Sequence, residues 1–72
     1  MRAAYDPASR AAIRWALAHW PIDGAPLRVV QVGVHERRVA GERLLRVVIE
    51  DAVGNRRCLL VTPAGDRVEE QA

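Results

Sequence analysis

The fold is decided by residues 27–51, which read LRVVQVGVHERRVAGERLLRVVIED. Val, Leu and Ile recur at alternate positions on both sides of Gly41, and glycine is a residue type that a tight turn favours. Two such runs joined by a short turn are typical of a β-hairpin. We therefore expect antiparallel strands over residues 27–39 and 42–51.

A third strand follows this hairpin. Gly54-Asn55 is a usual place for positive φ between paired strands, and residues 56–62 are almost continuously apolar from Cys58 onward. Residues 63–66, PAGD, form a further turn, after which the chain can add a short edge strand or fray. Because these connections are short, the sheet is expected to be antiparallel.

A helix precedes the sheet. Asp6-Pro7 marks its start, because Asp is a strong N-cap and Pro suits the first helical position. Residues 8–20 are rich in Ala, and Pro21 ends the run. At about 100° per residue, one face carries Ala12, Ile13, Ala16, Leu17 and Trp20. We predict that Ile13, Leu17 and Trp20 are buried against Val32, Val34, Val47 and Ile49.

These elements predict a single α+β domain over residues 1–72, with one N-terminal helix on a three- to four-stranded antiparallel sheet in α-β-β-β order. Its core is small, so a partner or a second copy would add stability. The single cysteine excludes an internal disulfide, and the two isolated histidines predict no metal site. No stretch approaches the roughly 18 apolar residues of a membrane span, and charged residues interrupt the N-terminal segment, so a cytoplasmic protein is expected.

The chemistry-bearing residues do not form a catalytic pattern. Ser9 lies in the first turn of the expected helix, and Cys58 lies within an apolar strand. Glu50 and Asp51 are adjacent, so their side chains point to opposite faces and cannot form a facing acid–base pair. We therefore predict a non-enzymatic protein without a cofactor.

The sheet has a second face that this one helix cannot cover. That face is expected to carry the apolar side chains of Val29, Leu44 and Val48, with Arg46 among them. One interpretation is a protein-binding patch, used by a second copy in a homodimer or by another partner, to which Trp15 could also contribute. The alternatives are scattered surface residues, a bulge within residues 27–30 that turns some of them inward, and packing of Trp15 over the helix flank onto a sheet edge or the C-terminal segment.

All eleven basic residues are arginines, and they give the chain a formal charge of +2. Seven of them fall within the expected sheet: Arg28, Arg37, Arg38, Arg43, Arg46, Arg56 and Arg57. A sheet that binds single-stranded nucleic acid also needs exposed aromatic residues on which the bases can stack. The three aromatic residues of this chain all precede the expected sheet in the sequence. Binding through phosphate contacts is kept as an alternative function.

The first hairpin suggests another alternative. Residues 29–41 resemble the cystatin segment that ends in Gln-Val-Val-Ala-Gly, and Val39-Ala40-Gly41 repeats the last three residues of that motif. Arg37 and Arg38 stand where the motif has its Gln and its first Val. The resemblance implies a cystatin-like fold and a protease inhibitor acting through this hairpin, although Ala64 replaces the Trp of the second cystatin hairpin.

Overall fold

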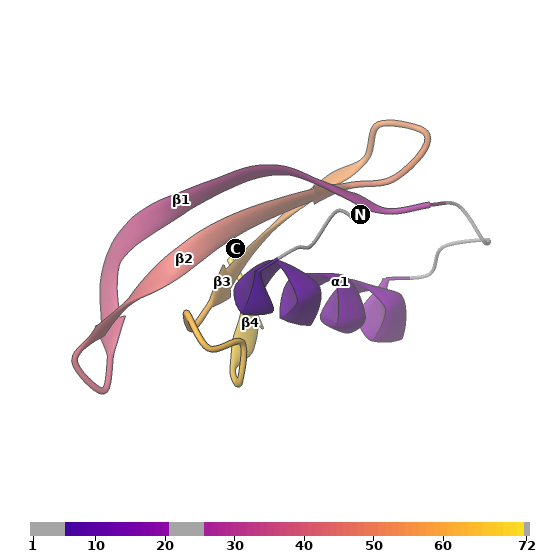
Figure 1. Cartoon of the computed structure of the whole chain (residues 1–72). Coiled ribbons are helices and arrows are strands. Elements are labelled where there is room, and N and C mark those ends of the chain that lie inside the picture. Colours follow the sequence, from indigo (N-terminus) through magenta and orange to yellow (C-terminus); the bar gives the residue numbers. More distant parts are fainter. Residues whose placement is uncertain (1–5, 21–25, 72) are drawn as a thin grey trace.

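One helix and four strands make up the described part of the chain, residues 6–20 and 26–71, in this computed structural model. The elements are α1 (Pro7–His19), β1 (Arg28–Val39), β2 (Glu42–Glu50), β3 (Arg56–Val61) and β4 (Val68–Glu70). The strands pair antiparallel in the order β1-β2-β3-β4, and α1 lies on the concave side of the curved sheet (Figure 1). The predicted α+β class is confirmed.

The start of α1 follows the predicted capping pattern. The Asp6 carboxylate accepts a hydrogen bond of 2.8 Å from the backbone N–H of Ser9, and Pro7 occupies the first turn. At the other end, the backbone N–H of Trp20 donates to the carbonyl of Ala16 at 2.8 Å. Pro21, the predicted stop, lies outside the described residues.

Two tight turns depend on backbone with positive φ. Ala40 and Gly41 have φ values of 53° and 84°, as in the two-residue turn that matches the twist of a hairpin. Gly65, with φ of 80°, lies directly against the start of α1. A Cβ at this position would lie 2.5 Å from the carbonyl oxygen of Pro7, so only glycine lets the β3–β4 turn pack this closely against the helix.

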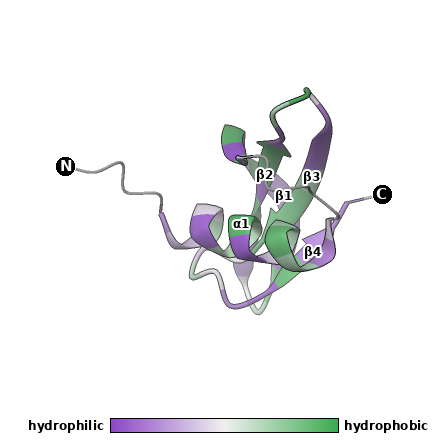
Figure 2. Ribbon diagram, turned by 90° about the vertical axis from the view of Figure 1, so that its right-hand side faces the viewer, coloured by the Kyte–Doolittle hydropathy of each residue, from purple (hydrophilic) through white to green (hydrophobic). Residues whose placement is uncertain are grey.

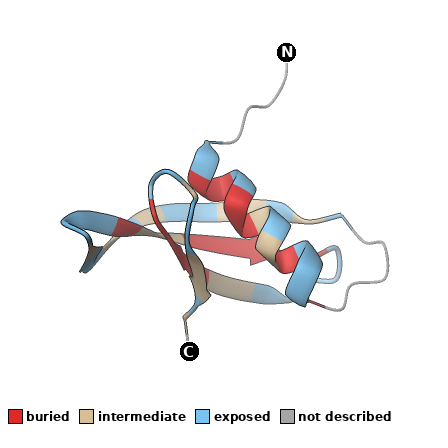
Figure 3. Cartoon of the chain, turned by 90° about the horizontal axis from the view of Figure 1, so that it is seen from below, coloured by how far each residue is buried: buried red, intermediate tan, exposed pale blue. Residues whose placement is uncertain are grey.

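Small side chains let α1 pack closely against the sheet. Ala8, Ala12 and Ala16 are all 0% exposed, and they form one stripe along the helix. The large, fully buried side chains in the core beneath this stripe are Val47 and Ile49 of β2 and Leu59 and Val61 of β3. Figure 3 colours segments of the helix and of the central strands as buried, and Figure 2 shows hydrophobic residues along β2 and β3.

Part of the predicted core is wrong. Trp20, Val47 and Ile49 are buried as expected, but Leu17 is 64% exposed, and Val32 and Val34 are 44% and 64% exposed. The alanine stripe, rather than the larger aliphatic residues, faces the sheet, and this turns Leu17 toward solvent. The helix packs mainly against β2, and it leaves part of the edge strand β1 uncovered.

The predicted face of Val29 is also wrong. The pairing of β1 with β2 shifts by one residue between Val29 and Gln31, so Val30 is an extra residue in the edge strand. Val29 therefore lies opposite Ile49 and packs against the core instead of joining the far face of the sheet. This is the bulge that the sequence left open as an alternative.

Candidate functional site

The face of the sheet away from α1, called the outer face below, is closed to solvent at its apolar residues. Leu44 is 2% exposed and Val48 is 5% exposed, and Leu60 of β3 is 4% exposed. The predicted exposed patch at Leu44 and Val48 is therefore wrong. In the described part of the chain no second layer packs here, so long side chains of the sheet itself must supply the cover.

An ion pair between β1 and β4 supplies part of this cover. The Arg37 guanidinium bonds the Glu69 carboxylate at 2.6 Å and 3.2 Å. Two strands separate these residues in the sheet, so the Arg37 side chain must reach past β2 and β3. Glu69 lies opposite Leu60, and the hydrogen bond from Arg37 is the main cause that lowers the pKa of Glu69 below its ordinary value.

Arg46 covers the middle of the outer face. Its Nε donates to Oε1 of Gln71 at 3.2 Å, and its Nη2 lies 3.3 Å from Sγ of Cys58. The aliphatic stem of an arginine can cover apolar neighbours while its charged end stays in water. Arg46 is thus held by the neighbouring strand β3 and by the C-terminal segment.

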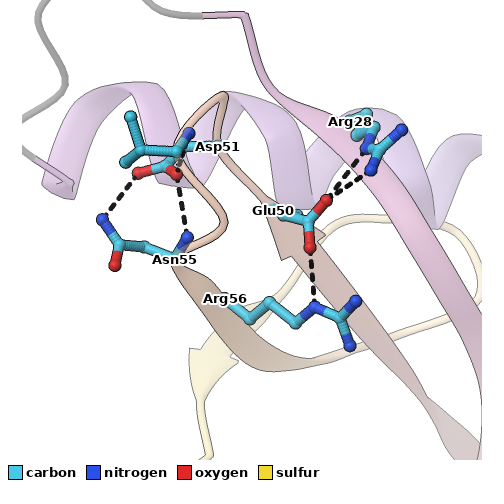
Figure 4. Close-up of polar contacts among 6 residues, drawn as sticks. Arg28, Glu50, Asp51, Asn55 and Arg56 are labelled. Atoms are coloured by element: carbon cyan, nitrogen blue, oxygen red, sulfur yellow. Dashed lines mark hydrogen bonds and ion pairs between the residues drawn. The ribbon is translucent and has the colours of Figure 1, made fainter.

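Glu50 is held between two other arginines at the end of β2 (Figure 4). Oε1 accepts bonds of 2.5 Å and 3.1 Å from Arg28, and Oε2 accepts one of 2.8 Å from Arg56. The carboxylate side chain is 10% exposed, whereas those of Arg28 and Arg56 are 70% and 62% exposed. The bonds from Arg28 and then from Arg56 lower the pKa of Glu50 below its ordinary 4.5.

The neighbouring Asp51 holds the β2–β3 loop (Figure 4). Oδ1 accepts bonds from the backbone N–H groups of Val53 and Asn55, and Oδ2 accepts one from the Asn55 side chain. Burial raises the pKa of Asp51, but these hydrogen bonds outweigh it and hold the pKa below 3.8. Both carboxylates border an open pocket of about 420 Å³, yet each of their four oxygens already accepts a hydrogen bond from the chain.

The depressed pKa of Glu50 predicts a loss of stability in acid. A group whose pKa is lower in the folded than in the unfolded chain stabilises the fold above its unfolded value and ceases to do so as the pH falls through the folded value. We expect Glu50→Gln to lower the melting temperature at pH 7, and this difference from the parent to shrink as the pH falls below 4.5. Thermal unfolding between pH 7 and pH 2, followed by circular dichroism, measures this.

The control for this prediction is Glu42→Gln, because Glu42 is an exposed carboxylate at the start of β2. Its substitution should leave the melting temperature close to that of the parent throughout the pH range. A Glu50→Gln protein with the melting temperature of the parent at pH 7 would contradict a stabilising role for the two arginine contacts.

The hairpin with the cystatin-like residues ends in a tight turn. Val39 is the last residue of β1, and Ala40-Gly41 is the whole connection to β2. Arg38 donates to the carbonyl of Gly41 at 3.0 Å, and Arg37 is bound to Glu69 as described above. Among the five hairpin residues 37–41, the side chains of Arg37 and Arg38 are thus held by contacts within the chain. Inhibition of a protease through this hairpin stays a prediction.

Trp15 packs along the flank of the helix. It is partly buried against the core, and its ring stacks on His19 with the centroids 4.5 Å apart. Nδ1 of His19 lies 2.9 Å from the carbonyl oxygen of Trp15, which ties the two residues together at the end of α1. Partial burial against the core agrees with a packing role for Trp15, but its stacking partner is His19 of the same helix, and one side of the stacked pair remains at the surface.

Most arginines of the sheet have partners within the chain. Carboxylates pair with four of the seven: Arg28, Arg37, Arg56 and Arg57. Arg57 also lies over the ring of Trp20, 5.0 Å from its centroid. These contacts reduce the positive charge that the sheet offers to phosphate groups, and phosphate binding gains no support from this arrangement.

The described residues present apolar side chains to solvent at a different place, the edge strand β1. Val32 and Val34 lie opposite Val47 and Leu45, so they share the helix-side face of the sheet, but they remain 44% and 64% exposed. β1 is 12 residues long, and within residues 6–20 and 26–71 only one of its two sides is paired, by β2. Sequence reasoning missed this site because it placed both valines beneath the helix.

Comparisons with known proteins identify no relative. No protein-family model matches the chain, and neither the curated proteins nor the solved structures give a significant match.

Among residues 6–20 and 26–71, no group of three or more His, Cys, Asp or Glu side chains is placed to hold a metal ion. The one helix in these ranges is too short to cross a membrane.

Proposed function

We propose that this chain is a non-enzymatic, cytoplasmic protein-binding domain that binds along the open edge of β1. The observation that carries the proposal is the exposure of Val32 and Val34 on a long edge strand. The unpaired N–H and C=O groups of an edge strand are a template for another strand, and the side chains at alternate positions select its sequence.

The composition of β1 suits this mode of binding. Residues 29–34 carry no charged side chain and include four valines. Arg28 precedes them, and Glu36 follows them. An extended segment with apolar residues at alternate positions would therefore find apolar contacts in the middle of β1 and charged groups at both ends.

The three carboxylates with lowered pKa values, Glu50, Asp51 and Glu69, support a binding role over catalysis. A catalytic acid or base needs a free oxygen that can reach a substrate. Glu50, Asp51 and Glu69 all use their oxygens to hold neighbouring strands and loops together. The single Cys58 suits a reducing compartment such as the cytoplasm, in which thiols stay reduced.

The test is site-specific photo-crosslinking in the native cells. A photoreactive amino acid at position 34 should form an adduct with another polypeptide, because this side chain would lie beside the bound segment. The matched control is position 53, another exposed valine, which lies in the β2–β3 loop and is 81% exposed. Adducts of equal yield from both positions, or none from position 34, would contradict the proposal.

A further inference from the structure

Resting on this proposed function, we propose that the bound segment is β1 of a second copy of this chain. The two β1 strands pair antiparallel, with Val32 of each copy on a two-fold axis. Most soluble homo-oligomers are symmetric, and an antiparallel pairing of identical strands satisfies two-fold symmetry by itself.

Irregularities confine this pairing to the middle of β1. The register with β2 shifts between Val29 and Gln31, and again between Val34 and Arg38. Bulges and charged side chains protect edge strands from pairing, and here they stand at both ends of the strand. The regular part between them, residues 31–34, contains neither a bulge nor a charged side chain.

The side chains favour one register. When residue 32 pairs with its own copy, Gln31 of each chain lies opposite Gly33 of the other, and Val34 comes close to the bulged Val30. Val32 and Val34 are on the helix-side face, so the valines of both copies meet on that face and cover one another. A shift by one residue would place Gln31 opposite Val34 and mix the two faces of the sheet.

Charge favours the same antiparallel arrangement. It brings the end of β1 that carries Arg28 beside the end of the second copy's β1 that carries Glu36, twice in the dimer because of the symmetry. The Arg28 side chain is 70% exposed although it bonds Glu50, and Glu36 is exposed, without an ion-pair partner among the described residues.

The resulting dimer closes the open edge of each copy. The two four-stranded sheets become one continuous sheet, and the axis through residue 32 puts both helices on the same side. The paired valines then lie between the two helices. The outer faces, with their arginine and glutamate pairs, remain free, as expected for surfaces that are already covered within each chain.

The test combines disulfide trapping with the mass in solution. Cys58 is the single cysteine, so Cys58→Ser provides a thiol-free background. In this background Val32→Cys should cross-link to its own copy under mild oxidation, because directly opposed residues lie within the reach of a disulfide. Val34→Cys should not, since it would be about 13 Å from its own copy.

Sedimentation equilibrium gives the second readout. We expect the parent to approach twice its 8.0 kDa mass as its concentration rises, and Val32→Lys to remain at 8.0 kDa with an unchanged circular dichroism spectrum. A parent that stays monomeric would overturn the second copy as the occupant. Val34→Cys alone cross-linking as fast as Val32→Cys would overturn the register centred on residue 32. If adducts to other proteins still form from position 34, the proposed function stands; without them, both proposals fall.

Discussion

Replacement of Leu59 by alanine is expected to lower the free energy of unfolding by about 2–5 kcal/mol. Leu59 is 0% exposed and lies opposite Val47 in the middle of the core. The backbone around it is fixed by pairing with both β2 and β4, so the cavity left by alanine cannot collapse freely. Urea unfolding, followed by circular dichroism at low protein concentration, measures this loss.

Leu17→Ala is the matched control, because it deletes the same atoms from an exposed site. We expect it to change the free energy of unfolding by less than about 0.5 kcal/mol. The comparison separates the observed core, built on the alanine stripe of α1, from the one that the helical periodicity suggests. Equal losses of unfolding free energy in the two variants would show that α1 is rotated about its axis so that Leu17 faces the sheet.

Val48→Asp should destabilise the monomer by about 3 kcal/mol or more, since it buries a carboxylate on the outer face. Val48 is 5% exposed and lies between Gln31 of β1 and Cys58 of β3. The short aspartate side chain cannot reach solvent past Arg46 and the other long side chains that cover this face. Urea unfolding measured well below the concentration of any dimer tests the monomer alone.

The same substitution at Val34 provides the control. Val34 is also a strand valine but is 64% exposed, so Val34→Asp should cost less than about 1 kcal/mol. A small loss for Val48→Asp would mean that the arginine side chains do not seal the outer face, and that this face is again available to a partner.

The backbone of this domain is largely predictable from local sequence. Asp6-Pro7 and the alanine-rich run predict α1, and the turn at Gly41 predicts where β1 ends and β2 begins. These signals act over a few residues, through capping, propensity and turn geometry. Each stands in the sequence next to the element that it determines.

The exposed surface is less predictable because it depends on contacts between distant residues. The pair that covers the outer face, Arg37 and Glu69, is separated by 32 residues, and no local pattern marks it. The bulge at Val30 changes which face each neighbouring valine occupies, so strict alternation misplaces Val29. Such errors move a predicted binding surface from the edge of the sheet to its face.

The most direct test of the central claim, that β1 pairs with a second strand, is amide hydrogen exchange read residue by residue in solution. Alternate N–H groups of residues 31–34 point away from β2 and have no partner among the described residues of the monomer. The account predicts that these amides exchange slowly at high protein concentration and rapidly on dilution, while the amides of β3 stay protected throughout. Rapid exchange of the outward amides at every concentration would contradict it.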